Sequence, residues 1–117
     1  MGAARLLRWQ WSGYPRFHCG RANLLVHGVA VPVFLAGNIV LVLALPRGAV
    51  VPAALGLAAM AVSLAVQGRG HATEATPVEP FTGAANAVAR ILLEQWITFP
   101  RFVLTGGWLR ALRASAR

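Results

Sequence analysis

The sequence predicts an all-α fold: a small helical integral membrane protein with an antiparallel transmembrane hairpin plus an interfacial or third membrane helix. Three observations support this prediction. The 117 residues are 57% hydrophobic and only 12% charged, two long runs contain no Asp, Glu, Lys or Arg, and the arginines lie outside those runs. A chain of this length forms a single domain, residues 1–117, and its apolar content excludes intrinsic disorder.

Residues 24–45 form the first expected span, because about 20 consecutive apolar residues cross the hydrocarbon core of a bilayer. Residues 50–67 form the second, and the Pro-Arg-Gly trio at 46–48 is expected to be the turn between them. The second run places Gly56, Ala59 and Ser63 at spacings that let a neighbouring helix approach closely. Two buried helices of a soluble bundle would each show a polar stripe, and neither run has one.

The basic residues predict the orientation, since cytoplasmic flanks of membrane helices are enriched in Lys and Arg. Of the 11 basic residues, only Arg47 lies in the expected turn, and the others precede the first run or follow the second. We therefore expect a multi-pass protein of the bacterial inner (cytoplasmic) membrane with both termini cytoplasmic. Because the charge flanks apolar runs, membrane lipids are expected partners and nucleic acid is not.

The segment of about residues 84–109 supports two interpretations. In the first, residues 84–99 form an amphipathic helix that lies in the membrane interface and is stopped by Pro100, with Arg90 and Glu94 one turn apart on its wet face. In the second, residues 87–109 form a third span with Glu94 and Arg101 buried against the other helices. The sequence favours the interfacial helix, because a charge at the bilayer centre costs about 2.5–3.5 kcal/mol.

Polar residues in and beside the apolar runs are the candidate functional residues, because membrane insertion disfavours them. His27 lies one turn inside the first run, and His71 follows the second run by one turn. In an antiparallel hairpin with a rise of about 1.5 Å per residue, their depths differ by only about 5 Å, so the imidazoles can meet at the cytoplasmic face. Glu74 would share a helix face with His71 if the helix continued. Asn23 and Gln67, each one turn from a histidine, could orient the imidazoles.

His18 adds a third imidazole on the same side of the first run. A shell of imidazole and carboxylate ligands that leaves positions open suits a non-haem Fe(II) ion, which can then bind dioxygen and substrate. We therefore expect His18, His27, His71 and Glu74 to be the metal-binding and catalytic residues, with Glu74 either a fourth ligand or the carboxylate that orients His71. Zinc or manganese would accept the same ligands. Axial ligation of a haem by His27 and His71 is a further hypothesis.

These polar residues belong to a two-part pattern that includes nearby glycines and prolines. The pattern consists of His18, Asn23, His27, Gly28 and Pro32, followed by Gln67, Gly70, His71, Glu74 and Pro77. Together with the later stretch 94–108, it resembles the Mpo1-like family, formerly a domain of unknown function. The resemblance implies a multispanning membrane protein whose characterised fungal member is an Fe(II)-dependent dioxygenase of fatty-acid α-oxidation, shortening a 2-hydroxy long-chain fatty acid by one carbon. Its essential histidines would correspond to His18, His27 and His71.

On this resemblance the expected partners are dioxygen and a long-chain 2-hydroxy fatty acid, whose carboxylate Arg21 and Arg69 could bind. The chain is shorter than the fungal enzyme, so the further spans are either missing or supplied by a second copy in a homo-oligomer. The alternative function is non-enzymatic. In that case the chain is a small inner-membrane protein that interacts with lipid or assists assembly, and its interfacial histidines bind no metal.

Overall fold

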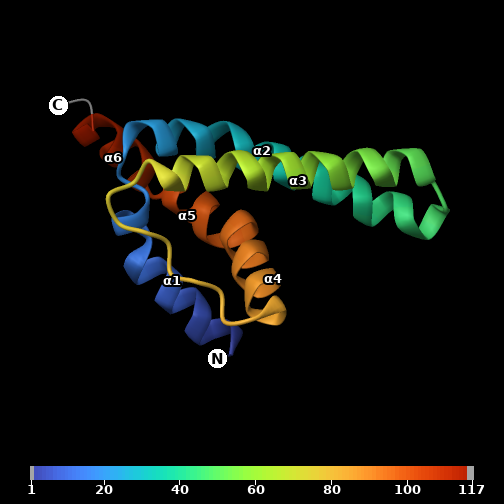
Figure 1. The fold of residues 1–117 in the computed structure, drawn as a ribbon, viewed down its shortest axis with the longest axis horizontal. Helices are drawn as coiled ribbons and strands as arrows, with labels where there is room; N and C mark the ends of the chain where they lie inside the picture. Colours follow the sequence, from blue (N-terminus) through green and yellow to red (C-terminus); the bar gives the residue numbers. More distant parts are fainter. Residues whose placement is uncertain (1, 116–117) are drawn as a thin grey trace.

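The computed structural model describes residues 2–115, and all regular structure in this part of the chain is helical. Two long helices, α2 (Arg21–Ala44) and α3 (Val50–Ala72), pack side by side as an antiparallel hairpin (Figure 1). The two apolar runs are therefore helices, as expected, and both helices extend beyond the runs. α2 starts at residue 21 instead of 24, and α3 continues to residue 72 instead of 67.

The hairpin turn lies where the Pro-Arg-Gly trio predicted it. A short 3₁₀ turn, η1 (Leu45–Arg47), follows α2, and Gly48 then adopts a left-handed conformation with φ of 62°. The N–H of Gly48 donates to the carbonyl of Leu45 at 3.1 Å. Glycine adopts this conformation without the steric penalty that a Cβ atom would add, so it suits the reversal of the chain.

The two long helices approach most closely where two glycines face each other. A Cβ atom on Gly37 would lie 2.7 Å from the carbonyl oxygen of Gly56. A Cβ atom on Gly56 would lie 2.6 Å from the carbonyl oxygen of Gly37. Nearer the open end of the hairpin, the Ser63 hydroxyl donates to the carbonyl of Ala30. Small residues let helix backbones approach in this way. The small-residue face expected on the second run is therefore the face that packs on α2.

The shorter helices form a second layer against the open half of the hairpin (Figure 1). α1 (Ala3–Phe17) precedes the hairpin, and a helical run of α4 (Ala84–Leu93), η2 (Glu94–Thr98) and α5 (Phe99–Leu104) follows it. In the last helix, α6 (Gly107–Ser115), Trp108 donates its indole N–H to the Leu24 carbonyl at 2.8 Å. A cluster of buried apolar side chains lies where these elements meet α2, and its members are Tyr14, Leu24, Val31, Phe99 and Phe102.

Two helices of the described chain are long and apolar enough to cross a membrane, Arg21–Arg47 and Val50–Ala72. Within the most apolar window of each, only 28% and 22% of the residues are buried. The core helix of a soluble protein would be mostly buried. Most of the hairpin's apolar surface is therefore left uncovered by the rest of residues 2–115.

The expectation that Pro100 stops the helix is wrong. The helix continues through a π-helical turn, η2, into α5. Pro100 has no N–H for the carbonyl four residues earlier, and its ring would clash with that carbonyl, so a wider turn accommodates it. The helical run ends at Leu104, and α4 diverges from the direction of the hairpin (Figure 1).

Candidate metal centre

Three imidazoles from three elements meet at the open end of the hairpin. His18 directly follows α1, His27 lies in α2, and His71 lies in the last turn of α3. Their ring centroids are 4.7, 4.7 and 4.8 Å apart, and the ring planes are nearly perpendicular to one another. His18 and His27 are 3% and 0% exposed. The hairpin thus brings His27 and His71 together at one depth, and the end of α1 adds His18.

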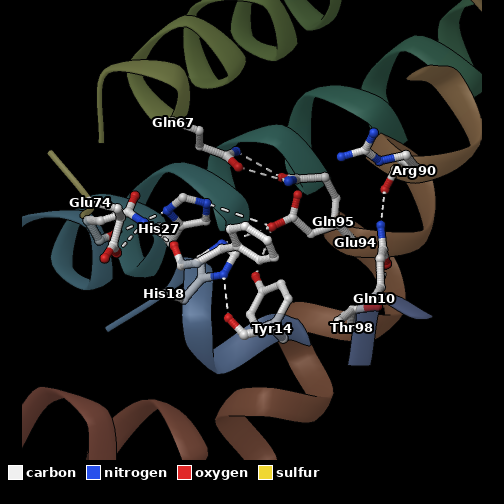
Figure 2. Close-up of polar contacts among 12 residues, drawn as sticks. Gln10, Tyr14, His18, His27, Gln67, Glu74, Arg90, Glu94, Gln95 and Thr98 are labelled. Carbon is white, nitrogen blue, oxygen red and sulfur yellow. Dashed lines mark hydrogen bonds and ion pairs between the residues drawn. The ribbon is translucent and has the colours of Figure 1, made fainter. Parts of the chain in front are cut away.

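Hydrogen bonds to backbone carbonyls orient two of these rings (Figure 2). His18 Nδ1 lies 3.0 Å from the Tyr14 carbonyl oxygen, and His27 Nδ1 lies 3.0 Å from the Asn23 carbonyl oxygen. Because a carbonyl only accepts, each Nδ1 carries a proton, and in the neutral ring Nε2 presents a lone pair. These two Nε2 atoms and Nδ1 of His71 are buried without a hydrogen-bond partner within residues 2–115. Buried polar atoms normally have partners, so the three nitrogens point to a ligand.

The carboxylate of Glu94, in η2, completes this group. Its Oε2 lies 3.3 Å from His18 Nε2 and 3.8 Å from His27 Nε2, and it accepts a hydrogen bond from the Tyr14 hydroxyl at 2.9 Å. One ligand atom from each of His18, His27, His71 and Glu94 lies within 4.8 Å of all the others. A lone pair that faces a carboxylate oxygen is repelled unless a proton or a cation lies between them.

The electrostatics of the group favour a cation. Burial by itself would raise the pKa of the Glu94 carboxyl, but His18 in its protonated form, through a hydrogen bond and its charge, protonated His27 and the Tyr14 hydroxyl outweigh burial and lower this pKa to about 2. Burial and the neighbouring carboxylate raise the pKa of the Tyr14 hydroxyl well above its usual value. At neutral pH the group therefore contains an ionised carboxylate beside a neutral phenol.

The structure corrects the expected carboxylate ligand, because Glu94 and not Glu74 lies at the imidazoles. α3 ends before Glu74, so the helix does not continue far enough to keep this side chain on the face of His71. The Glu74 carboxylate instead accepts the backbone N–H groups of Cys19 and Gly20 at 3.1 and 3.0 Å. Glu74 therefore ties the linker between α1 and α2 to the end of α3.

The two residues expected to orient imidazoles have other partners. Asn23 holds His27 through its backbone carbonyl, while its side-chain amide donates to Glu74 at 2.7 Å. Gln67 exchanges a pair of 2.9 Å hydrogen bonds with Gln95 of η2 (Figure 2). Gln67 thus acts on the group at a distance, by fixing the turn that carries its carboxylate.

The position of Glu94 depends on how η2 is held between two other helices. The Gln67–Gln95 pair fastens it to α3, and the Thr98 hydroxyl donates to the Gln10 side chain of α1 at 2.7 Å (Figure 2). π-Helical turns occur frequently at functional sites. The sequence feature that could have identified this position is the adjacent Glu-Gln pair inside an apolar helical stretch.

The expectation that Arg90 and Glu94 lie on a wet helix face is also wrong. Arg90 is only 8% exposed, and its guanidinium donates to the carbonyls of Glu79 and Pro80 at 2.9 and 3.1 Å. The face of α4 that appears amphipathic in the sequence packs against α1 and the segment after α3. Its polar side chains are therefore paired with protein groups.

A cavity of about 380 Å³ adjoins the metal-binding group, and three of the four members of that group line it. Arg21 and Arg69, the expected partners of a substrate carboxylate, are both exposed and are not among its lining residues. The arginines that line the cavity are Arg16 and Arg90. An anion in the cavity would therefore meet different cations from those that the sequence suggested.

The donors fit a transition-metal ion. Imidazole and carboxylate ligands suit iron, zinc and manganese. An ion about 2.1 Å from each donor holds the donors at most about 4.2 Å apart, so small side-chain shifts close the observed spread of 4.8 Å. A haem between His27 and His71 does not fit, because His18 and Glu94 converge on the point where its ring would lie.

The fold and the site together define an all-α protein with an apolar hairpin and a buried group of three histidines and one glutamate able to hold a metal ion. Comparisons of the chain with protein-family models, curated proteins and solved structures give no match. Function is therefore inferred from the chemistry of this group and from the sequence pattern that contains its histidines.

Proposed function

We propose that this chain is a membrane-embedded Fe(II)-dependent dioxygenase that acts on 2-hydroxy long-chain fatty acids. The observation that carries the proposal is the set of buried, unpartnered nitrogens on His18, His27 and His71 that converge on the Glu94 carboxylate. The sequence pattern that resembles the Mpo1-like family contains the same histidines. The geometry and the resemblance support one metal centre independently.

These donors accept either Fe(II) or zinc, and the resemblance favours Fe(II). Structural zinc sites are closed and four-coordinate, whereas an octahedral ion held by the same donors keeps positions for exogenous ligands. When bound, Fe(II) supplies the redox chemistry through which dioxygen reacts with the substrate. The bond between the carboxyl carbon and C2 breaks and C2 is oxidised from an alcohol to a carboxylic acid. One 2-hydroxy acid and one dioxygen give the acid one carbon shorter, carbon dioxide and water, so dioxygen is the only oxidant required.

The chain's own residues keep the ligands in one ionisation state and one orientation. The carbonyl partners of His18 and His27 leave both Nε2 atoms free for the metal. Tyr14 donates to Glu94 and stacks on His18, with ring centroids 3.8 Å apart and an interplanar angle of 12°. A divalent ion bound by a single carboxylate keeps a net positive charge, which attracts the substrate carboxylate.

We infer that the hairpin crosses the bacterial inner membrane with both termini in the cytoplasm. Its uncovered surface carries large apolar side chains, such as Val29, Leu43, Val50 and Leu55, which are all exposed in the described chain. An apolar surface of this extent is typical of contact with lipid. The basic residues lie almost entirely at the open end, which supports a cytoplasmic position for that end. The metal centre would then lie at the interface, where an acyl chain is available from the bilayer.

Metal analysis and oxygen uptake of detergent-purified protein test the proposal. We expect stoichiometric iron and oxygen consumption with 2-hydroxypalmitate. His71→Ala should lose both, because it removes a ligand, whereas Glu74→Gln should keep both, because this carboxylate lies outside the group. Iron content that is unchanged in His71→Ala would overturn the proposal. Absence of iron from the unaltered protein would also overturn it and would favour the non-enzymatic function.

A further inference from the structure

The cavity beside the metal centre continues away from the histidines along α4. Glu94 lines it beside the imidazoles, and Arg90 lines it one helical turn further on, on the far side of Glu94 in Figure 2. There the Arg90 guanidinium carbon lies 5.0 Å from the ring centroid of Trp9 and 4.4 Å from that of Phe81. Both rings also line the cavity. The end remote from the metal is therefore built from an arginine that lies against two aromatic rings and donates two hydrogen bonds to backbone carbonyls.

The rest of the lining is mostly apolar, with Arg16 and Glu79 as its charged members, and it comes from four segments. Phe17 lies on α1, Leu64 on α3, Val78 in the segment after α3, and Ile91 on α4. The wall amides, Gln10 and Gln67, are hydrogen-bonded to other protein groups. An occupant of this stretch therefore meets hydrocarbon and aromatic surface and few polar groups that lack a partner. A chain of methylene groups suits such a passage, because each buried methylene adds favourable free energy without needing a hydrogen bond.

Gly68 has no packing reason to be a glycine. It lies inside α3 and lines the cavity, and a Cβ atom there would have no described atom within 4 Å. Nearby Gly70 is different, because its Cβ atom would lie 2.5 Å from Asn23 Oδ1. A glycine in a helix interior is less favourable than alanine. Gly68 is exposed at the mouth of the cavity, so the space beside it is open both to the outside and to an occupant of the cavity.

We propose that the unbranched acyl chain of the substrate lies in this cavity, with its head at the metal centre and its tail directed towards Arg90, and that Gly68 sets the width of the passage. This inference rests on the proposed function for the identity of the substrate. The acyl chain would then lie in the space between α1, α3 and α4, and Gly68 would be a specificity-determining position. A bulky side chain there would occupy the space of several methylene groups and would keep the acyl chain from reaching the remote end of the cavity.

Cross-linking with a palmitate that carries a diazirine on its terminal carbon tests this assignment. We expect the label on peptides that contain Trp9, Phe81 or Ile91. Gly68→Trp should reduce that labelling by more than about tenfold, since the indole ring overpacks the passage and blocks the acyl chain from the remote end. Ala65→Trp is the matched control, because Ala65 is exposed on the same helix and does not line the cavity. It should label like the unaltered chain.

Two further measurements separate failure of this inference from failure of the proposed function and from misfolding. Iron content of Gly68→Trp should match the unaltered chain, and Phe81→Ala, which opens the remote end, should shift preference from palmitate towards stearate. Label spread over the exposed hairpin faces, or equal labelling of Gly68→Trp and Ala65→Trp, would overturn the inference even if iron and oxygen uptake are present. Cavity labelling in a protein without iron would overturn the dioxygenase proposal and leave a fatty-acid site in place.

Discussion

Replacing Glu94 with glutamine tests which carboxylate binds the metal. The substitution keeps the shape of the side chain and removes its charge. Glu94 Oε2 lies 3.3 Å from His18 Nε2. In the variant, an amide nitrogen at this position can donate a hydrogen bond to the lone pair of His18 Nε2, which the carboxylate cannot do. We therefore expect Glu94→Gln to weaken metal binding while leaving the metal-free protein no less stable. Loss of a group that only orients a ligand costs about 10- to 100-fold in metal affinity, so loss of the ligand itself should cost at least about 100-fold, or about 2.7 kcal/mol.

Denaturant unfolding with and without added Fe(II), under anaerobic conditions, measures this effect. At metal concentrations above both dissociation constants, the stabilisation by metal should fall by the same amount, about 2.7 kcal/mol. Glu74→Gln is the matched control, since it changes a carboxylate outside the group, and it should bind metal like the unaltered chain. Undiminished metal affinity in Glu94→Gln, or a loss confined to Glu74→Gln, would refute the assignment.

Three further predictions follow from other contacts in the described chain. Gly37→Ala should force α2 and α3 apart, because its Cβ atom would lie 2.7 Å from the Gly56 carbonyl oxygen. Thermal unfolding should show that the free energy of unfolding falls by about 1–3 kcal/mol. Tyr14→Phe should lower metal affinity about 10- to 100-fold in a chelator competition, because it removes the hydroxyl that donates to the metal-binding carboxylate. Burial opposes ionisation of Glu74, but hydrogen bonds from Asn23 and from the backbone of the α1–α2 linker lower its pKa below the usual value. The stability that ionised Glu74 contributes is therefore complete above the pKa of an unfolded glutamate, about 4.3, and is lost as pH falls through the lower folded pKa. In Glu74→Gln, the free energy of unfolding should therefore decrease less as the pH falls through this range.

The first of these predictions has a control variant in the same chain, and each of the three has an outcome that would contradict it. Gly68→Ala adds a methyl group to open space and should leave the stability unchanged or raise it by about 0.5–1 kcal/mol. If Gly37→Ala and Gly68→Ala were equally stable, the close helix crossing would be contradicted. An unchanged chelator competition in Tyr14→Phe would show that the hydroxyl does not support the carboxylate. An acid unfolding curve that is identical in Glu74→Gln and the unaltered chain would remove the capping role of Glu74.

Local sequence properties were sufficient to predict the hairpin and the meeting of two histidines. The apolar runs gave both long helices, and Gly48 marked the reversal between them. The rise of an α-helix is constant, so counting residues from the turn placed His27 and His71 at nearly the same depth. These conclusions hold because helix length and chain reversal depend mainly on neighbouring residues.

Only the tertiary structure decided which carboxylate completes the group. Whether Glu74 shares a face with His71 depends on where α3 ends, and whether Glu94 faces water depends on what packs against its helix. The contact between Tyr14 and Glu94 joins positions 80 residues apart, and the Gln67–Gln95 pair joins positions 28 residues apart. Pairings of this kind arise from the packing of separate elements, and helical periodicity in a single segment carries no information about them.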